Sequence, residues 1–304
     1  LVTVLYSLAD TLFVGMMNDQ IQNAAVALAA PALLAFNAVI NLFGIGSSSM
    51  MSRALGRGDL KTVCASASLG FYGTVVSGAL LSALCYIFMQ PFVVLLGGDI
   101  NTAAATTAYM NWAVVCGAIP TILNVVMGYM VRAEGASLHA SIGTMSGCIL
   151  NMILDPFFIL PWGLGMGAAG AGLATFLSNC FACCYFFGLL MVRKKKTNIN
   201  LNPKYLSLTK EIVFAVMEVG IPAAIQNLLN VTGMTILNNF VAGYGSSAVA
   251  AVGIAQKVYM VPIQVALGGT QGIMPLVGYS YASKNKQRFE ETIQTVMKLL
   301  VPCM

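Results

Sequence analysis

Residues 138–161 read LHASIGTMSGCILNMILDPFFILP, an apolar run whose single acidic residue is Asp155. A helix of this length and composition can cross the hydrocarbon core of a bilayer. The chain is 58% hydrophobic and 8% charged, so it cannot present an ordinary solvated surface. The sequence therefore predicts an all-α polytopic membrane protein. Similar apolar runs recur at 1–17, 21–50, 62–96, 105–131, 166–192, 211–242, 247–278 and 288–304.

Lysine and arginine gather in every second connection between these runs. The basic connections contain Arg53, Arg57 and Lys61, then Arg132, then Arg193 to Lys196 with Lys204 and Lys210, and finally Lys284, Lys286 and Arg288. The alternate connections, at 18–20, 97–104, 162–165 and 243–246, contain neither residue type. By the positive-inside rule, the basic connections face the cytoplasm, and we expect the plasma (inner) membrane as the location. The net charge of +5 is then a topology signal with some affinity for anionic lipid headgroups, and nothing in it points to nucleic acid.

An internal repeat predicts how the runs are grouped. The sequence AAVALA at 24–29 returns as AAVGIA at 250–255, an offset of 226 residues that spans six runs. Because six is even, both copies enter the membrane in the same direction, as in transporters built from parallel repeats. We therefore expect two pseudosymmetric six-helix lobes, 1–192 and 211–304, joined by a cytoplasmic linker at 193–210.

The same repeat bears on the length of the protein. Two units of this size predict a complete protein of about 452 residues, of which this chain would be the N-terminal two-thirds. Residue 1 is Leu rather than Met, and the last run stops at Met304. We therefore expect a shortened first helix and a truncated second lobe.

Two aspartates, Asp10 and Asp155, lie inside the apolar runs. An ionisable residue in the membrane costs several kcal/mol, so it usually faces the protein interior or a wet cavity. At about 1.5 Å per residue, Asp10 lies about 11 Å and Asp155 about 9 Å below the outer surface, with Asn151 at about 15 Å and Thr175 at about 14 Å. Four polar groups from three helices are thus predicted to share one layer.

The chemistry of this layer suits a coupling cation. Asn151 and Asp155 are four residues apart and share a helix face, and Pro156 can open or kink the helix beside them. Two carboxyls in one poorly hydrated site cannot both ionise easily, which favours reversible binding of H⁺. The same oxygens, with Asn151 and Thr175, could instead hold Na⁺. A purely structural role, in which the aspartates satisfy interhelical hydrogen bonds, is the third interpretation.

Several short motifs together give the chain a family resemblance. In order and spacing, they resemble the multidrug and toxic compound extrusion (MATE) family along essentially the whole chain. The resemblance implies twelve helices around a central cavity and the export of organic, often cationic compounds in exchange for H⁺ or Na⁺. It matches Asp10, Asn151 and Asp155 to the cation site of the first lobe, and Thr175 if the sixth helix aligns as 172–175. The motifs are ADTLFVG at 9–15, RALGRGD at 53–59, RAEG at 132–135, LNMILDP at 150–156, GIP at 220–222 and QGIMPLVGY at 271–279.

The second lobe departs from part of that family. Some members carry a glutamate eight residues after the Gly-x-Pro proline, where this chain has Asn230. Asn227, Asn230 and Asn238 are spaced to share one helix face, so we expect either a neutral polar wall of the substrate cavity or hydrogen bonds between helices. Lys257 lies about 15 Å below the outer surface, too deep to reach that side easily, and either faces the cavity or contacts interhelical carbonyls or water.

These observations predict a secondary active antiporter that exports organic compounds in exchange for H⁺, with Na⁺ as the alternative ion. We expect no enzymatic activity and no cofactor, a small organic substrate, contact with membrane lipid, and a monomer. A lipid-linked oligosaccharide flippase of related architecture is the nearest alternative and would be expected to have a more basic cavity. A membrane enzyme is a more distant alternative. Such an enzyme would need a second catalytic group, and no His, Ser-Lys pair or nucleophilic Cys lies at the depth of Asp10.

Overall fold

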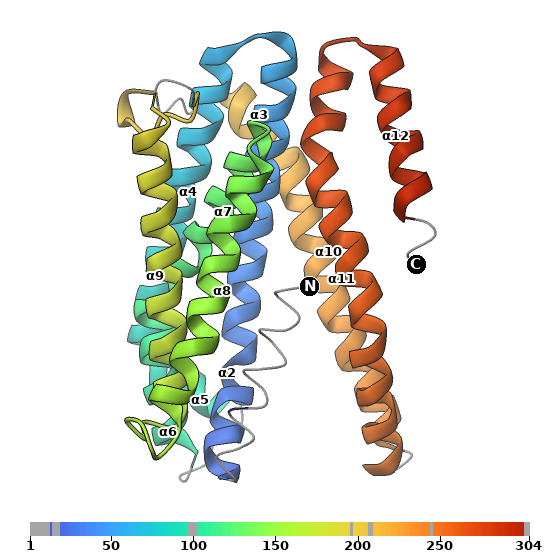
Figure 1. Ribbon diagram of the computed structural model, residues 1–304. Helices are drawn as coiled ribbons and strands as arrows, with labels where there is room; N and C mark the ends of the chain where they lie inside the picture. Colours follow the sequence, from blue (N-terminus) through green and yellow to red (C-terminus); the bar gives the residue numbers. More distant parts are fainter. Residues whose placement is uncertain are drawn as a thin grey trace.

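The computed structural model describes residues 13, 19–95, 102–194, 197–205, 209–243 and 246–300, and every element in these ranges is a helix. Figure 1 shows the long helices running side by side along one axis. The predicted all-α fold is therefore confirmed. The elements are α2 (Gln20–Val39), η1 (Ile40–Ile45), α3 (Gly46–Arg57), α4 (Leu60–Ile87), α5 (Met89–Leu95), α6 (Ala103–Met110), η2 (Asn111–Cys116), α7 (Ala118–Ala133), α8 (Ser137–Ile159), α9 (Ala168–Val192), η3 (Pro203–Tyr205), α10 (Lys210–Ala242), α11 (Ser246–Ala282) and α12 (Lys286–Leu300).

The helices follow the apolar runs of the sequence. Among the described residues, five helices are long and apolar enough to cross a membrane, and a sixth crossing is added if a bent pair counts as one span. That pair is Ala103–Cys116 with Ala118–Ala133, which meet at an angle of 47°. The bend follows the π-helical turn η2, and such turns interrupt the regular hydrogen-bond ladder. α11 and α12 are outside this set, and of the first predicted run, 1–17, only Phe13 is among the described residues.

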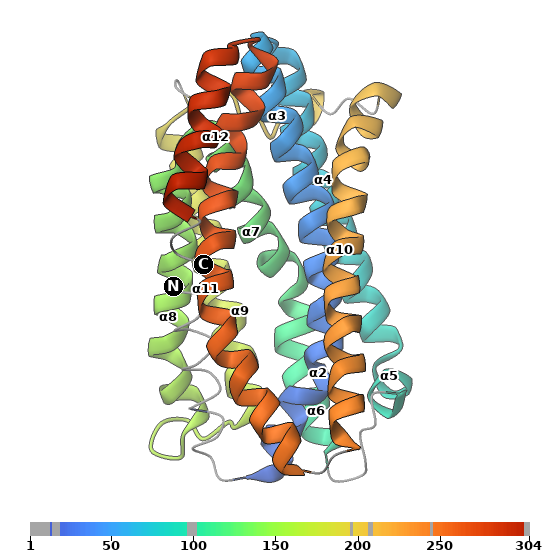
Figure 2. The same ribbon diagram turned by 90° about the vertical axis from the view of Figure 1, so that its right-hand side faces the viewer.

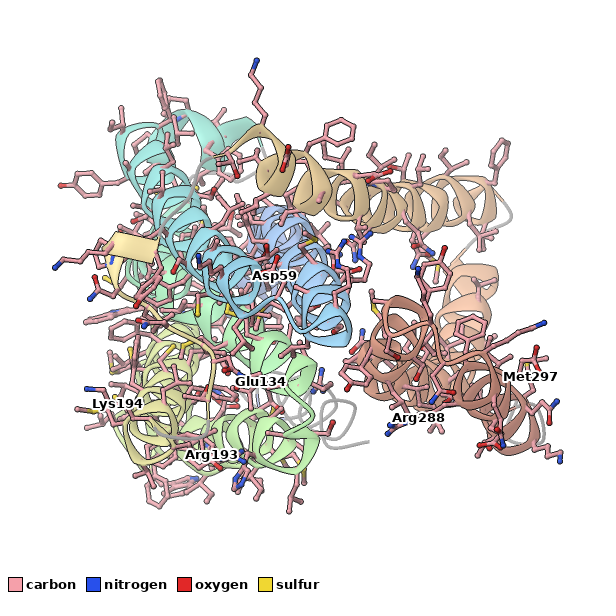
Figure 3. All side chains as sticks on the ribbon, turned by 90° about the horizontal axis from the view of Figure 1, so that it is seen from above. Asp59, Glu134, Arg193, Lys194, Arg288 and Met297 are labelled. Atoms are coloured by element: carbon pink, nitrogen blue, oxygen red, sulfur yellow. The ribbon has the colours of Figure 1, made fainter. Side chains whose placement is uncertain are left out.

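The basic connections lie together at one end of the bundle, here called the basic end. Figure 3 looks onto this end and labels Asp59, Glu134, Arg193 and Arg288, which come from four different connections or helix ends. The turn from α3 to α4 is short because Gly58 adopts a left-handed conformation with φ of 73° and Asp59 caps α4 by accepting from the Thr62 amide at 3.2 Å. The fold thus has the alternation that the lysines and arginines predicted.

Hydrogen bonds attach the segment between α9 and α10 to α4 and to the α7–α8 turn. The Glu134 carboxylate accepts hydrogen bonds from the Thr197 hydroxyl at 2.6 Å and from the Asn198 amide at 2.5 Å. On one face of α4, Cys64, Ser68 and Tyr72 donate to the carbonyls of Asn198, Asn200 and Leu201. These bonds hold residues 197–201 along α4 and against the α7–α8 turn.

α10 packs along α2, η1 and α3, which form one long helix, and α11 packs against α3 (Figure 2). The contact with α10 depends on Gly220, where an added Cβ would lie 2.1 Å from the Leu42 carbonyl oxygen. At the basic end, an added Cβ at Gly56 would lie 2.4 Å from the Tyr279 carbonyl oxygen of α11. Small residues let helix backbones touch in a membrane, where lipid gives apolar side chains little reason to associate. Figure 1 shows α11 beside α3 at the basic end. At the opposite end of the bundle, α11 is well separated from α8.

Candidate cation site between α8 and α9

Asp155 is completely buried, with 0% of its surface exposed, and Asn151 is 2% exposed one turn earlier in α8. When the Asn151 amide is oriented to satisfy both neighbours, its NH₂ donates to Asp155 Oδ2 at 2.9 Å. Its carbonyl oxygen then accepts from the Thr175 backbone amide at 3.1 Å. In the reversed orientation, the NH₂ lies 3.4 Å from Thr175 Oγ1. The structure therefore brings Asn151, Asp155 and Thr175 together, as the depth estimate predicted.

Close packing of α8 on α9 brings these residues together. An added Cβ at Gly147 would lie 3.1 Å from the Ala182 Cβ and 3.3 Å from the Ser178 carbonyl oxygen, so the two helices approach closely here. One turn further toward the opposite end, Asn151 of α8 faces Thr175 of α9. Glycine at 147 thus sets the helix separation that a single amide can bridge.

Pro156 follows Asp155 inside α8 without ending the helix, which continues to Ile159. Because proline has no N–H, it cannot donate to the carbonyl of Met152 one turn earlier. The predicted opening of the helix is thus limited to one missing backbone donor beside the carboxyl.

The polar site extends further than the sequence predicted. The Asn179 side chain donates to Thr121 Oγ1 at 3.0 Å and to the Thr175 carbonyl at 2.9 Å. Its oxygen accepts from Asn124 Nδ2 at 3.0 Å. The hydrogen-bonded groups therefore run from Asp155 through α9 to α7, across three helices. In a low-dielectric interior, such a chain of bonds fixes its members in place.

A pattern in the sequence could have pointed to this extension. Asn179 lies four residues after Thr175, and Thr121 and Asn124 are three residues apart in an otherwise apolar run. Each pair therefore shares a helix face. What the sequence does not contain is the rotation of α7 that turns its polar pair toward α9.

Other predicted site residues are not assembled by the described structure. Asp10 lies outside the described residues, as do the side chains of Asn238 and Lys257. Asn230 is exposed, and Asn227 is partly buried with an oxygen that has no hydrogen-bond partner among the described residues. The polar wall of a substrate cavity stays a prediction.

Comparison with protein families gives a match to the MatE model over residues 1–157 and 222–304. The chain belongs to the MatE family. The resemblance seen in the short motifs is therefore confirmed. The matched ranges include Asp10, Asn151 and Asp155, whereas Thr175 falls between them. Family membership and the apolar helices together make the protein a multi-pass integral membrane protein.

Two similar MatE relatives are staphylococcal proteins. The multidrug export protein MepA of Staphylococcus saprophyticus is 31% identical over 302 residues, which cover 99% of this chain and 65% of that protein. MepA of Staphylococcus aureus is 30% identical over 309 residues, covering 100% of this chain and 67% of that protein. The chain thus spans about two thirds of the length of these relatives.

The fold also matches solved MatE structures. The crystal structure of MATE in complex with MaD5 superposes with a TM-score of 0.91 at 26% sequence identity, covering 98% of this chain and 67% of that one. The helices of this chain are therefore arranged as in the corresponding part of that MATE structure.

Proposed function

We propose that this chain forms the greater part of a secondary active antiporter that exports organic compounds, many of them cationic, in exchange for H⁺. The proposal is supported by MatE membership and by the multidrug export relatives. The observation that carries it is the carboxyl of Asp155, fully buried and hydrogen-bonded to Asn151. Buried acids within a membrane are costly and usually functional.

The Asn151 amide supports a proton as the coupling ion, because it can serve both states of the acid. With its NH₂ toward Asp155, it donates to a carboxylate. With the amide reversed, the NH₂ faces Thr175 Oγ1 and the carbonyl oxygen can accept the O–H of a protonated acid. Loading and unloading a proton then needs only an amide rotation. In the predicted layer, Asn151 and Thr175 supply only two oxygens beyond the carboxyls of Asp10 and Asp155, so backbone carbonyls or water would have to complete a sodium shell.

Transport would follow from competition between proton and substrate. We place the two lobes at 1–192 and 211–304, joined by the cytoplasmic linker 193–210, in the plasma membrane. Proton binding at Asp155 favours substrate release to the outside, and proton loss restores a state that binds substrate again after the lobes reorient. This function needs no catalytic residue, so the protein is proposed as a transporter and not an enzyme.

Transport by the full-length protein in proteoliposomes tests the function. A fluorescent organic cation should accumulate when a pH gradient is imposed, and a Na⁺ gradient at constant pH should give no accumulation. Absence of transport under both gradients would refute the antiporter. Transport of a fluorescent lipid-linked sugar without transport of the cation would favour the flippase instead.

A further inference from the structure

A cavity of about 760 Å³ lies at the basic end, between α3 on one side and α10, α11 and α12 on the other. It is separate from the Asp155 site, which lies toward the opposite end of α8. Its wall contains four cationic side chains, from Arg53, Arg57, Lys284 and Lys286. The one acidic residue in the described wall is Glu290, whose Oε1 lies 3.8 Å from Nζ of Lys286. The cavity therefore carries an excess of positive charge.

Two polar groups in this wall are buried without partners. Among the described residues, neither Nε nor Nη2 of Arg53 has a hydrogen-bond partner. The hydroxyl of Ser280, a residue with 0% exposure, has none either in the described part of the chain. Burying such donors unpaired costs free energy, so native structures usually supply an acceptor. Nε and Nη2 form one edge of the guanidinium group, the edge that binds two oxygens of one anion side by side.

The remaining wall is apolar and includes Met50, Ala215 and Phe289. The cavity lies beside the α11–α12 turn, at the level where the basic connections meet lipid headgroups. An anionic group with an attached hydrocarbon portion complements both parts of the wall. Basic pockets between membrane helices on the cytoplasmic side commonly take acidic lipid headgroups.

We propose that this cavity binds the phosphate of an anionic phospholipid from the leaflet at the basic end. Arg53 donates from Nε and Nη2 to two phosphate oxygens, and the Ser280 hydroxyl donates to the same group. Lys284 and Lys286 favour a headgroup with net negative charge. Because Arg53 belongs to α3 and Ser280 to α11, the lipid joins the two sides of the bundle at this end. The proposal rests on binding alone and does not require the proposed transport function.

Lipid binding is measured on the full-length protein in neutral detergent. Phosphatidylglycerol and phosphatidylcholine with the same acyl chains are titrated separately and counted by native mass spectrometry. We expect phosphatidylglycerol to bind about tenfold more tightly. Arg53→Gln should weaken phosphatidylglycerol about tenfold, and Lys286→Gln about threefold. The Lys286 side chain is 88% exposed, so this second variant keeps the fold. Lys61→Gln, at an exposed lysine of the same end outside the cavity wall, is the matched control and should bind as the unchanged protein does.

Several outcomes would overturn the proposal. Equal binding of the two lipids would remove the charge argument. Unchanged phosphatidylglycerol affinity in both Arg53→Gln and Lys286→Gln would remove the site. If Arg53→Gln fails to fold, unchanged affinity in both Lys286→Gln and Ser280→Ala has the same meaning. Millimolar inorganic phosphate that displaces the lipid completely would identify free phosphate as the ligand instead. Failure of phosphatidylglycerol to bind the full-length protein would show that another part of the protein fills the cavity.

Discussion

Asn151 donates a hydrogen bond to Asp155 Oδ2 at 2.9 Å, from one turn earlier on the same face of α8. This bond gives a fully buried carboxylate a partner that can also serve its protonated form. A glutamine at 151 would be one methylene longer, and a serine would lack the amide. The distance between the helix positions of residues 151 and 155 therefore suits the side chain of asparagine. The pair is therefore the structural basis of the proposed exchange of H⁺ for substrate.

Thr175→Val distinguishes a proton site from a sodium site. The change removes Oγ1 but keeps the backbone amide that donates to Asn151. For a proton site we expect transport to fall only about twofold, because the Asp155–Asn151 bond survives and only the long contact of 3.4 Å between the reversed amide and Oγ1 is lost. Initial rates are measured at several Na⁺ concentrations and constant pH, with Thr175→Ser as the control that keeps the hydroxyl. A roughly tenfold increase in the Na⁺ required, about 1.4 kcal/mol, would show that the site binds sodium.

Gly220→Ala tests the contact between α10 and η1. The new Cβ would lie 2.1 Å from the Leu42 carbonyl oxygen, so the backbones must separate. We expect a loss of about 1–3 kcal/mol of stability in this conformation, seen as earlier thermal unfolding in detergent. Gly233→Ala is the control, because no described atom lies within 4 Å of its added Cβ and alanine favours helix. Equal unfolding temperatures for the two variants would contradict the packing described.

Much of this arrangement follows from residue spacing and from counting depth. The apolar runs predict the helices, and the i, i+4 spacing of Asn151 and Asp155 with their depth predicts the contact with Thr175. Asn179 with Thr121 was missed because interhelical partners depend on helix rotation, which close contacts such as Gly147 on Ser178 decide.

Backbone irregularities were also beyond the sequence. The π turns η1 and η2 replace regular helix inside apolar runs that have no proline at those positions. The hydrogen bond from the Asn198 amide to Glu134 joins two segments that are far apart in the chain. Neither composition nor period encodes such long-range contacts.

Accessibility of single cysteines tests the orientation. In a background without the eight native cysteines, Lys61→Cys should react with an impermeant thiol reagent only from the cytoplasmic side. Leu164→Cys, at a residue that is 65% exposed in the α8–α9 connection, should react only from outside. Both sites are exposed, Lys61 in the first turn of α4 and Leu164 in the α8–α9 connection, so each serves as the other's control for reagent quality. The reverse pattern would invert the topology and the depth estimates with it.

Asp59 gives the basic end a pH-dependent helix cap. Hydrogen bonds from Thr62, first from its side chain and then from its backbone, hold the pKa of Asp59 below its ordinary value. A lowered pKa means that the carboxylate stabilises the fold above the unfolded value, about 3.9, and that this contribution is lost as pH falls through the folded pKa. Asp59→Asn should therefore unfold at a lower temperature than the unchanged protein at about pH 7, with the difference shrinking as the pH falls below the unfolded value. A difference that is constant with pH would contradict this explanation.

Proton-coupled transport by Asp155→Asn tests the central claim most directly. The change keeps the volume of the side chain and its place beside Asn151 but removes the group that binds a proton. In proteoliposomes, with matched protein incorporation, we predict that the variant loses accumulation of an organic cation under a pH gradient, whereas Asp59→Asn at the surface retains it. Accumulation by a fully folded Asp155→Asn protein at the rate of the unchanged protein would show that Asp155 does not couple transport to H⁺.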